Sequence, residues 1–193
     1  MDESQRRVKP SPRELAAAVS KGTPDIIARG LDVLFCGINP GLYSAAVGHH
    51  FARPGNRFWP TLFAAGFTPR LYSAFEDEAL LELGCGITNV VARSSARAEE
   101  VTRDELSAGA KKLRRKLLRY RPRFLAVVGL GAFRTAFERP RAIVGLQPER
   151  IGDTAVWLLP NTSGLNANHL PAQLALLFED LRIAAGLPRR RVL

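Results

Sequence analysis

The sequence predicts an α/β fold in which a mainly parallel sheet carries helices on both faces, within one domain. Short apolar runs of strand length alternate with helix-like segments along the chain, which is the pattern of parallel sheets. Each run is apolar throughout, as expected for strands that are covered on both faces. A length of 193 residues suits a single domain, and a hydrophobic content of 46% is enough to bury a core.

In the first half of the chain, a helix N-terminus is recognisable near residue 11. Ser11 is the expected cap, Pro12 suits the first turn, and Glu14 stands three residues after the serine. The elements that follow are a strand over residues 31–38, helices over 57–66 and 76–83, and a second strand over 86–91. This half therefore supplies two of the expected strands.

The second half continues the alternation, beginning with a long amphipathic helix over residues 103–121. Its apolar positions are spaced by three, four or seven residues, which places them on one helical face. After it come a strand over residues 124–128, a helix over 132–138, a strand over 155–159 and a helix that opens at Pro171. Together the two halves predict strands and helices in regular alternation.

Charge and cysteine content narrow the class of partner and the compartment. The net charge is +10 and the pI is about 10.6, a balance typical of nucleic-acid-binding proteins, although a solvated arginine-rich surface is the alternative. No apolar stretch approaches the roughly 20 residues of a membrane span. The charged N-terminus lacks the apolar core of a signal peptide, and Cys36 and Cys85 show no metal or disulfide spacing. We therefore expect a cytoplasmic protein.

Polar loops follow the first and last expected strands. Residues 37–41 have the sequence GINPG, and residues 161–166 have the sequence NTSGLN. Ligands of parallel sheets bind beyond the carboxyl ends of the strands, so these two loops mark the candidate site. Gly37 and Gly41 allow another group to approach the backbone closely, and Pro40 suits the first turn of a helix whose amides face a ligand.

Asn39 is the candidate catalytic residue of the first loop. Its carboxamide offers one acceptor and two donors, so it can orient a water molecule without deprotonating it. The structural alternative is that Asn39 only caps the helix that follows. Other motifs do not fit a catalytic site. Residues 129–131 lack the third glycine of a dinucleotide site, and His49 and His50 are expected to be a solvated pair rather than metal ligands.

Four segments resemble the mismatch-specific uracil-DNA glycosylases, the bacterial relatives of thymine-DNA glycosylase within the uracil-DNA glycosylase superfamily. The segments are VLFCGINPGL, HFARPGNRFWPTLFAAGF, GITNVV and LLPNTSGL, and they occur in the right order within residues 24–182. The combination of GINPG with the downstream N-x-SGL segment is specific, because other branches place a histidine where this chain has Asn161.

The resemblance implies a monofunctional DNA glycosylase of base excision repair. Such an enzyme flips uracil, best from a G·U mismatch, or a related damaged base out of duplex DNA and hydrolyses its N-glycosidic bond. The resemblance further implies a three-layer α/β/α sandwich, a water positioned by Asn39, no cofactor or metal, and a monomer that acts on double-stranded DNA in the nucleoid. The alternatives are a nonenzymatic or impaired protein of the same fold that binds damaged DNA, and a nucleoside hydrolase, which would need a carboxylate cluster that these motifs lack.

The resemblance also assigns binding residues. Those expected to hold the flipped base are Ile38, Phe51, Asn89 and Asn161. Those expected to insert into the duplex or contact phosphate are Ser163, Gly164, Leu165, Asn166, Ala167, Arg53 and Arg57. Phe51 would stack on the base, Leu165 would fill the gap that the base leaves, and Asn161 would face the developing negative charge.

Three positions depart from the family pattern. Thr162 replaces a proline, which predicts a looser loop, and Ala167 replaces an arginine that stands beside the orphaned base. Ala92 replaces an acid that precedes Arg93 and that could support the water or the cationic sugar. The missing acid favours the alternative of an impaired enzyme.

The expected organisation is a basic, partly disordered N-terminal extension over residues 1–22, a catalytic domain over 23–187 and a basic tail over 188–193. The tail is expected to add nonspecific DNA affinity that falls with salt. The basic run over residues 111–123 is either a DNA-binding surface or a solvated helix face that points away from the site.

Overall fold

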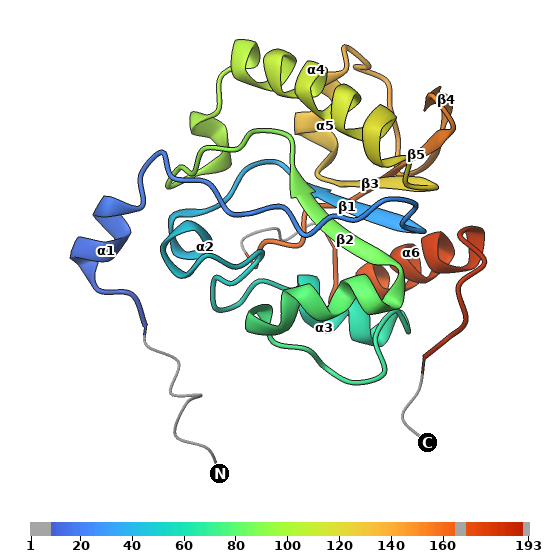
Figure 1. The fold of residues 1–193 in the computed structure, drawn as a ribbon, viewed down its shortest axis with the longest axis horizontal. Coiled ribbons are helices and arrows are strands. Elements are labelled where there is room, and N and C mark those ends of the chain that lie inside the picture. Colours follow the sequence, from blue (N-terminus) through green and yellow to red (C-terminus); the bar gives the residue numbers. More distant parts are fainter. Residues whose placement is uncertain (1–8, 165–168, 191–193) are drawn as a thin grey trace.

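The computed structural model describes residues 9–164 and 169–190, which form a five-stranded sheet between two layers of helices (Figure 1). The strands are β1 (Val33–Gly37), β2 (Cys85–Asn89), β3 (Phe124–Val128), β4 (Gly145–Ile151) and β5 (Thr154–Leu159), in the spatial order β2-β1-β3-β5-β4. All neighbouring strands pair in parallel except β4, which runs antiparallel to β5. The predicted α/β fold with a mainly parallel sheet is confirmed.

Helices cover both faces of the sheet, with α4 and α5 above it and α3 and α6 below it in the view of Figure 1. The α-helices are α1 (Pro12–Ala17), α2 (Leu42–Val47), α3 (Phe58–Ala64), α4 (Arg103–Tyr120), α5 (Leu130–Ala136) and α6 (Pro171–Ala184), and the 3₁₀-helices are η2 (Ala74–Leu83) and η3 (Ala98–Glu100). Ser11 caps α1 through the predicted capping box with Glu14. Among the described residues, none of the helices has the length and apolarity that crossing a membrane requires.

Successive residues of β1 pack into different layers, which explains why the strand is apolar throughout. Phe35 belongs to the cluster below the sheet, where its ring lies 5.4 Å from that of Phe58 and 6.0 Å from that of Phe178. Leu34 belongs to the cluster above the sheet, together with Leu113 of α4. Burying each such side chain contributes about 1.5–3 kcal/mol, so the two layers hold the sheet from both sides.

The strand that the sequence did not predict is β4. It contains Pro148, Glu149 and Arg150, and most of its residues are exposed or half-buried. Proline is tolerated on an edge strand because one side of that strand has no ladder to complete. Its register shifts between Leu146 and Arg150, so β4 is an irregular edge strand with no continuous apolar run.

β1 lies at the switch point of the sheet, with β2 on one side and β3 on the other. Ligand sites of doubly wound sheets lie at the carboxyl end of such a strand, because the connections leave in opposite directions there. The segments that follow β1 and β3 are in contact: a Cβ added to Gly129 would lie 3.0 Å from Cδ1 of Ile38. The GINPG loop therefore occupies the switch point.

The C-terminal end of the basic run lies near the amino ends of the strands, whereas Asn39 follows the carboxyl end of β1. The backbone oxygen of Tyr120, at the end of α4, accepts from the N–H of Gly30, and the N–H of Arg123 donates to the oxygen of Leu31, each at 2.8 Å. Both partners precede β1, whereas Asn39 follows it. The C-terminal end of this helix therefore lies at the amino ends of the strands, although Lys116 within the basic run donates to Oγ1 of Thr88, the residue before Asn89.

Candidate active site

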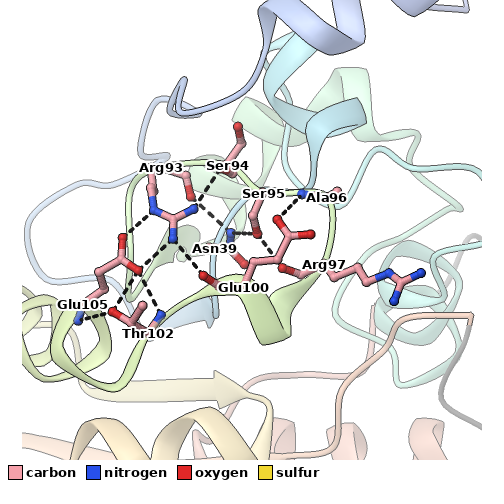
Figure 2. Close-up of polar contacts among 9 residues, drawn as sticks. All are labelled: Asn39, Arg93, Ser94, Ser95, Ala96, Arg97, Glu100, Thr102 and Glu105. Atoms are coloured by element: carbon pink, nitrogen blue, oxygen red, sulfur yellow. Dashed lines mark hydrogen bonds and ion pairs between the residues drawn. The ribbon is translucent and has the colours of Figure 1, made fainter.

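The carboxamide of Asn39 is held in one orientation at the carboxyl edge of the sheet. Its Nδ2 donates to the backbone oxygen of Arg93 at 3.1 Å and to Oγ of Ser95 at 2.8 Å (Figure 2). A carbonyl oxygen only accepts, and Ser95 Oγ already donates its own hydrogen to the carbonyl of Arg97 at 2.6 Å, so both partners require a donor. The amide nitrogen must face them, and Oδ1 is the atom that remains to accept from another molecule.

Asn39 does not cap the helix that follows it. α2 begins at Leu42, and its N-cap is Gly41, which makes no side-chain hydrogen bond. Pro40 precedes this cap instead of occupying the first turn, and its carbonyl accepts from the N–H of Ser95 at 3.2 Å. The alternative in which Asn39 is only a helix cap is therefore wrong, because its side chain crosses to the segment after β2.

Asn39 is held by residues 93–97, the acceptor loop. Ser94 fastens it to the N-terminal part of the chain, since its Oγ donates to the carbonyl of Ala18 and its N–H donates to the carbonyl of Lys21 at 2.8 Å. Ser94 and Ala18 are both fully buried. Residues upstream of the sheet therefore contribute to the frame of the candidate site.

The other attachment of the acceptor loop is an ion pair between Arg93 and Glu105, in the first turn of α4 (Figure 2). The hydrogen bonds from Arg93, followed by those from Thr102, lower the pKa of Glu105 to about 2. The carboxylate therefore stays charged throughout the neutral range, and so does the pair. Ala92, where the resemblance leads us to expect an acid, is exposed immediately before Arg93.

Asn89, the last residue of β2, pairs in register with Gly37, the last residue of β1. Asn89 Nδ2 lies 3.4 Å from Nδ1 of His50, whose Nε2 lies 2.8 Å from the carbonyl oxygen of Pro24. Because that oxygen only accepts, Nε2 carries the imidazole proton and Nδ1 accepts from Asn89. Oδ1 of Asn89 then lies against Gly37, where an added Cβ would be 2.5 Å away from it.

His50 is 3% exposed, so the expectation of a solvated histidine pair is wrong for this residue. Its backbone N–H donates to Oδ2 of the buried Asp77 at 3.1 Å, while Nδ1 of the half-buried His49 lies 3.0 Å from Oδ1 of the same carboxylate. The histidine pair is thus fixed between Asp77 and the end of β2, and His50 sets the orientation of Asn89.

The burial of His50 predicts a pH dependence of stability. Burial lowers the pKa of His50 below its ordinary 6.5, outweighing Pro24, Asp77 and Asp25, which raise it. The unfolded chain then takes up a proton that the folded chain resists, so the free energy of unfolding should fall below pH 6.5 toward the folded-state pKa, by at most about 1.4 kcal/mol per pH unit. His50→Gln, which cannot be protonated, should lose this slope in denaturant titrations between about pH 7.5 and 5.5. Equal slopes for the two proteins would contradict the prediction.

Phe51 lies at the end of β1, where it contacts both the core and Gly37. Its ring stacks on Phe58 with centroids 3.9 Å apart, and a Cβ added to Gly37 would lie 3.4 Å from its Cζ. The residue is half-buried and has a φ of 52°, in the left-handed region that non-glycine residues rarely adopt. The structure thus brings the predicted aromatic ring and the amide of Asn89 together around Gly37.

The segment after β5 is fastened to the residues before α3. The carbonyl of Thr162 accepts from the N–H of Arg57 at 2.9 Å, and its Oγ1 donates to Oδ1 of Asn56 at 3.1 Å. Thr162 is fully buried. At this position the threonine supplies a hydrogen bond that a proline could not. Residues 165–168 lie outside the described residues, so the expectation of a looser loop stays a prediction.

Arg57 also joins the two ends of this loop through its side chain. Nη1 donates to the carbonyl of His169 at 2.7 Å and Nη2 to the carbonyl of Ser163 at 3.1 Å. The guanidinium expected to contact phosphate is thus engaged by backbone oxygens. Arg53, by contrast, is exposed on the preceding turn.

The remaining predicted residues are placed only in part. Oδ1 of Asn161 accepts from the N–H of Ser163 at 2.8 Å, so the Nδ2 atom of Asn161 points away from that N–H. Ile38 is half-buried and its carbonyl accepts from the N–H of Val91 at 2.9 Å. Gly164 is exposed. Leu165, Asn166 and Ala167 lie outside the described residues.

Two comparisons with known proteins bear on this arrangement. Residues 24–182 match the family model of the uracil DNA glycosylase superfamily. The chain belongs to this superfamily. The solution NMR structure of a candidate uracil DNA glycosylase from Methanosarcina acetivorans is similar to this chain with a TM-score of 0.53 and 17% identity, covering 85% of this chain and 99% of that one. Similarity at this level shows the shared fold.

The superfamily match includes the segments that carry the site, among them Asn39, Asn89 and the acceptor loop. It begins after Ala18 and Lys21, the residues that fasten Ser94, so this attachment lies outside the matched residues. Among the described residues, no group of three or more His, Cys, Asp or Glu side chains is placed to hold a metal ion.

Proposed function

We propose that this chain is a monofunctional DNA glycosylase that flips uracil, best from a G·U mismatch, out of duplex DNA and hydrolyses its N-glycosidic bond. The observation that carries the proposal is the fixed carboxamide of Asn39, whose Oδ1 is oriented to accept a hydrogen bond from water. As the glycosidic bond lengthens, the sugar gains the character of an oxocarbenium ion. The water oxygen bonds to the anomeric carbon and gives up one proton to the surrounding solvent, while the base leaves as an anion with the electrons of the broken bond and takes up a proton from solvent.

A neutral amide suffices for this role because the cationic sugar is a strong electrophile. The base would leave toward Asn161, whose amide nitrogen is a donor for its negative charge. Leu165, with Gly164, Asn166 and Ala167, would enter the gap in the duplex, and Ser163 and Arg53 would contact phosphate. Membership of the superfamily and the net charge of +10 both support double-stranded DNA as the partner.

The orientation of Asn89 supports uracil over cytosine as the base. With Nδ2 directed to His50, Asn89 offers Oδ1 as an acceptor beside its second N–H donor. Uracil presents the matching pair, an imino N–H next to a carbonyl, whereas cytosine presents an acceptor next to an amino group. A matched bidentate contact is worth about 1–3 kcal/mol of discrimination, and stacking on Phe51 would add a similar amount for either base.

The proposal is tested by base release. Duplexes that carry U·G, U·A or T·G, and single-stranded uracil DNA, are incubated with the protein, and abasic sites are then cleaved by alkali. We expect cleavage of U·G first, with Asn39→Ala as the inactive control. Binding of the duplexes without any cleavage would instead support a damaged-DNA-binding protein.

Ala92 carries a separate prediction. A carboxylate next to the acceptor loop would favour the cationic sugar electrostatically, so Ala92→Asp is expected to excise uracil several-fold faster than the parental chain. Single-turnover rates on the U·G duplex measure the change, with Ala92→Asn as a control of similar size and no charge. Equal rates for the parental chain and Ala92→Asp would show that the missing acid does not limit this protein.

A further inference from the structure

The side chain of Glu105 joins α4 to the acceptor loop. Its Oε2 accepts from the backbone N–H of Thr102 at 2.9 Å and from Thr102 Oγ1 at 3.0 Å, which completes the capping box of the helix. The same carboxylate binds the guanidinium of Arg93 through two hydrogen bonds, from Nε to Oε1 and from Nη2 to Oε2, the second at 2.7 Å. A bidentate pair fixes direction as well as distance, so Glu105 is a rigid attachment point on a long helix.

Arg93 connects Glu105 to the candidate site, because its side chain binds Glu105 and its backbone oxygen contacts Asn39. Nη2 also donates to the carbonyl of Glu100 at 3.0 Å, so the guanidinium is fixed to two elements at once (Figure 2). The backbone oxygen of the same residue accepts from Nδ2 of Asn39. Ser94, the next residue, is fastened to Ala18 from the other side. The carbonyl of Arg93 is thus placed by its side chain and by the residue that follows it.

We infer that the Arg93–Glu105 pair is a positioning device for the proposed reaction: it holds the Arg93 carbonyl that orients the carboxamide of Asn39. The inference rests on the proposed glycosylase function. Without the pair, the carbonyl can turn away, and the carboxamide can rotate so that Nδ2 replaces Oδ1 toward the water. A donor in that place would occupy the lone pair with which the water attacks. Arg93 and Glu105 therefore act through Asn39 and not on the DNA.

The test compares Arg93→Ala and Glu105→Ala with Arg70→Ala. Arg70 also pairs with a capping-box glutamate, Glu76 of η2, through one hydrogen bond at 2.6 Å, and none of its contacts among the described residues reaches the acceptor loop. Single-turnover excision from the U·G duplex is expected to fall about tenfold or more in the first two variants, as for other residues that orient a catalytic group, with Kd for DNA unchanged. Arg70→Ala should stay within about twofold of the parental chain. Parental rates in both site variants, or an equal loss of DNA affinity, would overturn the inference.

A second measurement does not depend on activity. In NMR spectra, the side-chain N–H₂ signals of Asn39 are identified by their absence in Asn39→Ala. Their hydrogens should exchange with water slowly in the parental chain and quickly in Glu105→Ala. Unchanged exchange in that variant would overturn the inference even if excision fell. If the parental chain releases no base, the proposed function fails while this readout still decides the positioning role. Thermal unfolding of each variant identifies a folding defect. Glu105→Gln, which keeps the shape of the side chain and loses its charge, replaces any variant that does not fold. Hydrogen exchange of the Asn39 side chain is expected to be faster in Glu105→Gln as well.

Discussion

Asn39→Ala is expected to lower the single-turnover rate of uracil excision by at least about 100-fold, the scale on which removal of one preorganised polar group acts. The methyl group cannot accept a hydrogen bond from the attacking water, so the water loses its position beneath the sugar. Binding of U·G duplex should change by less than about twofold, because the base and phosphate contacts proposed above come from other residues. Excision at the parental rate would show that Asn39 does not position the water.

Asn39→Asp tests whether the attacking water needs only a side-chain oxygen atom at position 39 or needs that oxygen in a fixed orientation. A carboxylate still offers oxygen to the water, but it places acceptors against the carbonyl of Arg93 and against Ser95 Oγ, which both require donors. We expect Asn39→Asp to be little more active than Asn39→Ala at neutral pH. It should also unfold more readily, because two partly buried hydrogen bonds are replaced by contacts between acceptors. Parental activity in this variant would show that the water needs only an oxygen atom.

The sheet could be predicted from the sequence wherever burial leaves a continuous apolar run. β3 was predicted with the observed bounds of residues 124–128, and β1 and β5 differ from prediction by only a few residues at their ends. β4 could not be found in this way, because an edge strand with Pro148 and two charged neighbours shows no run to detect. Its pairing with β5 is a property of the folded sheet and not of the segment alone.

The site was predictable to the extent that it is encoded in residue types. Asn39 follows an apolar run and is conspicuous there as an amide, whereas Asn89 was assigned through the family resemblance. The partner that orients Asn39 is a backbone carbonyl, which any residue at position 93 would supply, so no residue type marks it. Glu105 is recognisable from sequence as the last residue of a T-x-x-E capping box, but its bond to Arg93 depends on how the chain folds back. His50 was misjudged because a histidine pair indicates neither burial nor exposure.

Gly37→Ala is expected to lower excision about 100-fold while leaving the fold intact. An added Cβ would lie 2.5 Å from Oδ1 of Asn89 and 3.4 Å from Cζ of Phe51. The closer atom is the end of a side chain that can rotate, so the protein can relieve the contact at small cost in stability. The rotation, however, breaks the hydrogen bond of Asn89 to His50 and moves the amide away from the base. The contact to the base edge is worth about 1–3 kcal/mol, and part of the stacking on Phe51 is lost with it. Together these losses account for a fall in excision of about 100-fold.

Gly131→Ala is the matched control for this variant, because a Cβ added to Gly131 in α5 would meet no atom within 4 Å. It should retain both the parental melting temperature and the parental rate. For Gly37→Ala, the melting temperature should fall by no more than a few degrees, and the loss should be larger for U·G excision than for nonspecific duplex binding. A parental rate would mean that Asn89 and Phe51 do not face the flipped base. A large fall in the melting temperature would mean that the side chain of Asn89 cannot rotate away from the added methyl group, and that Gly37 is required for the stability of the fold.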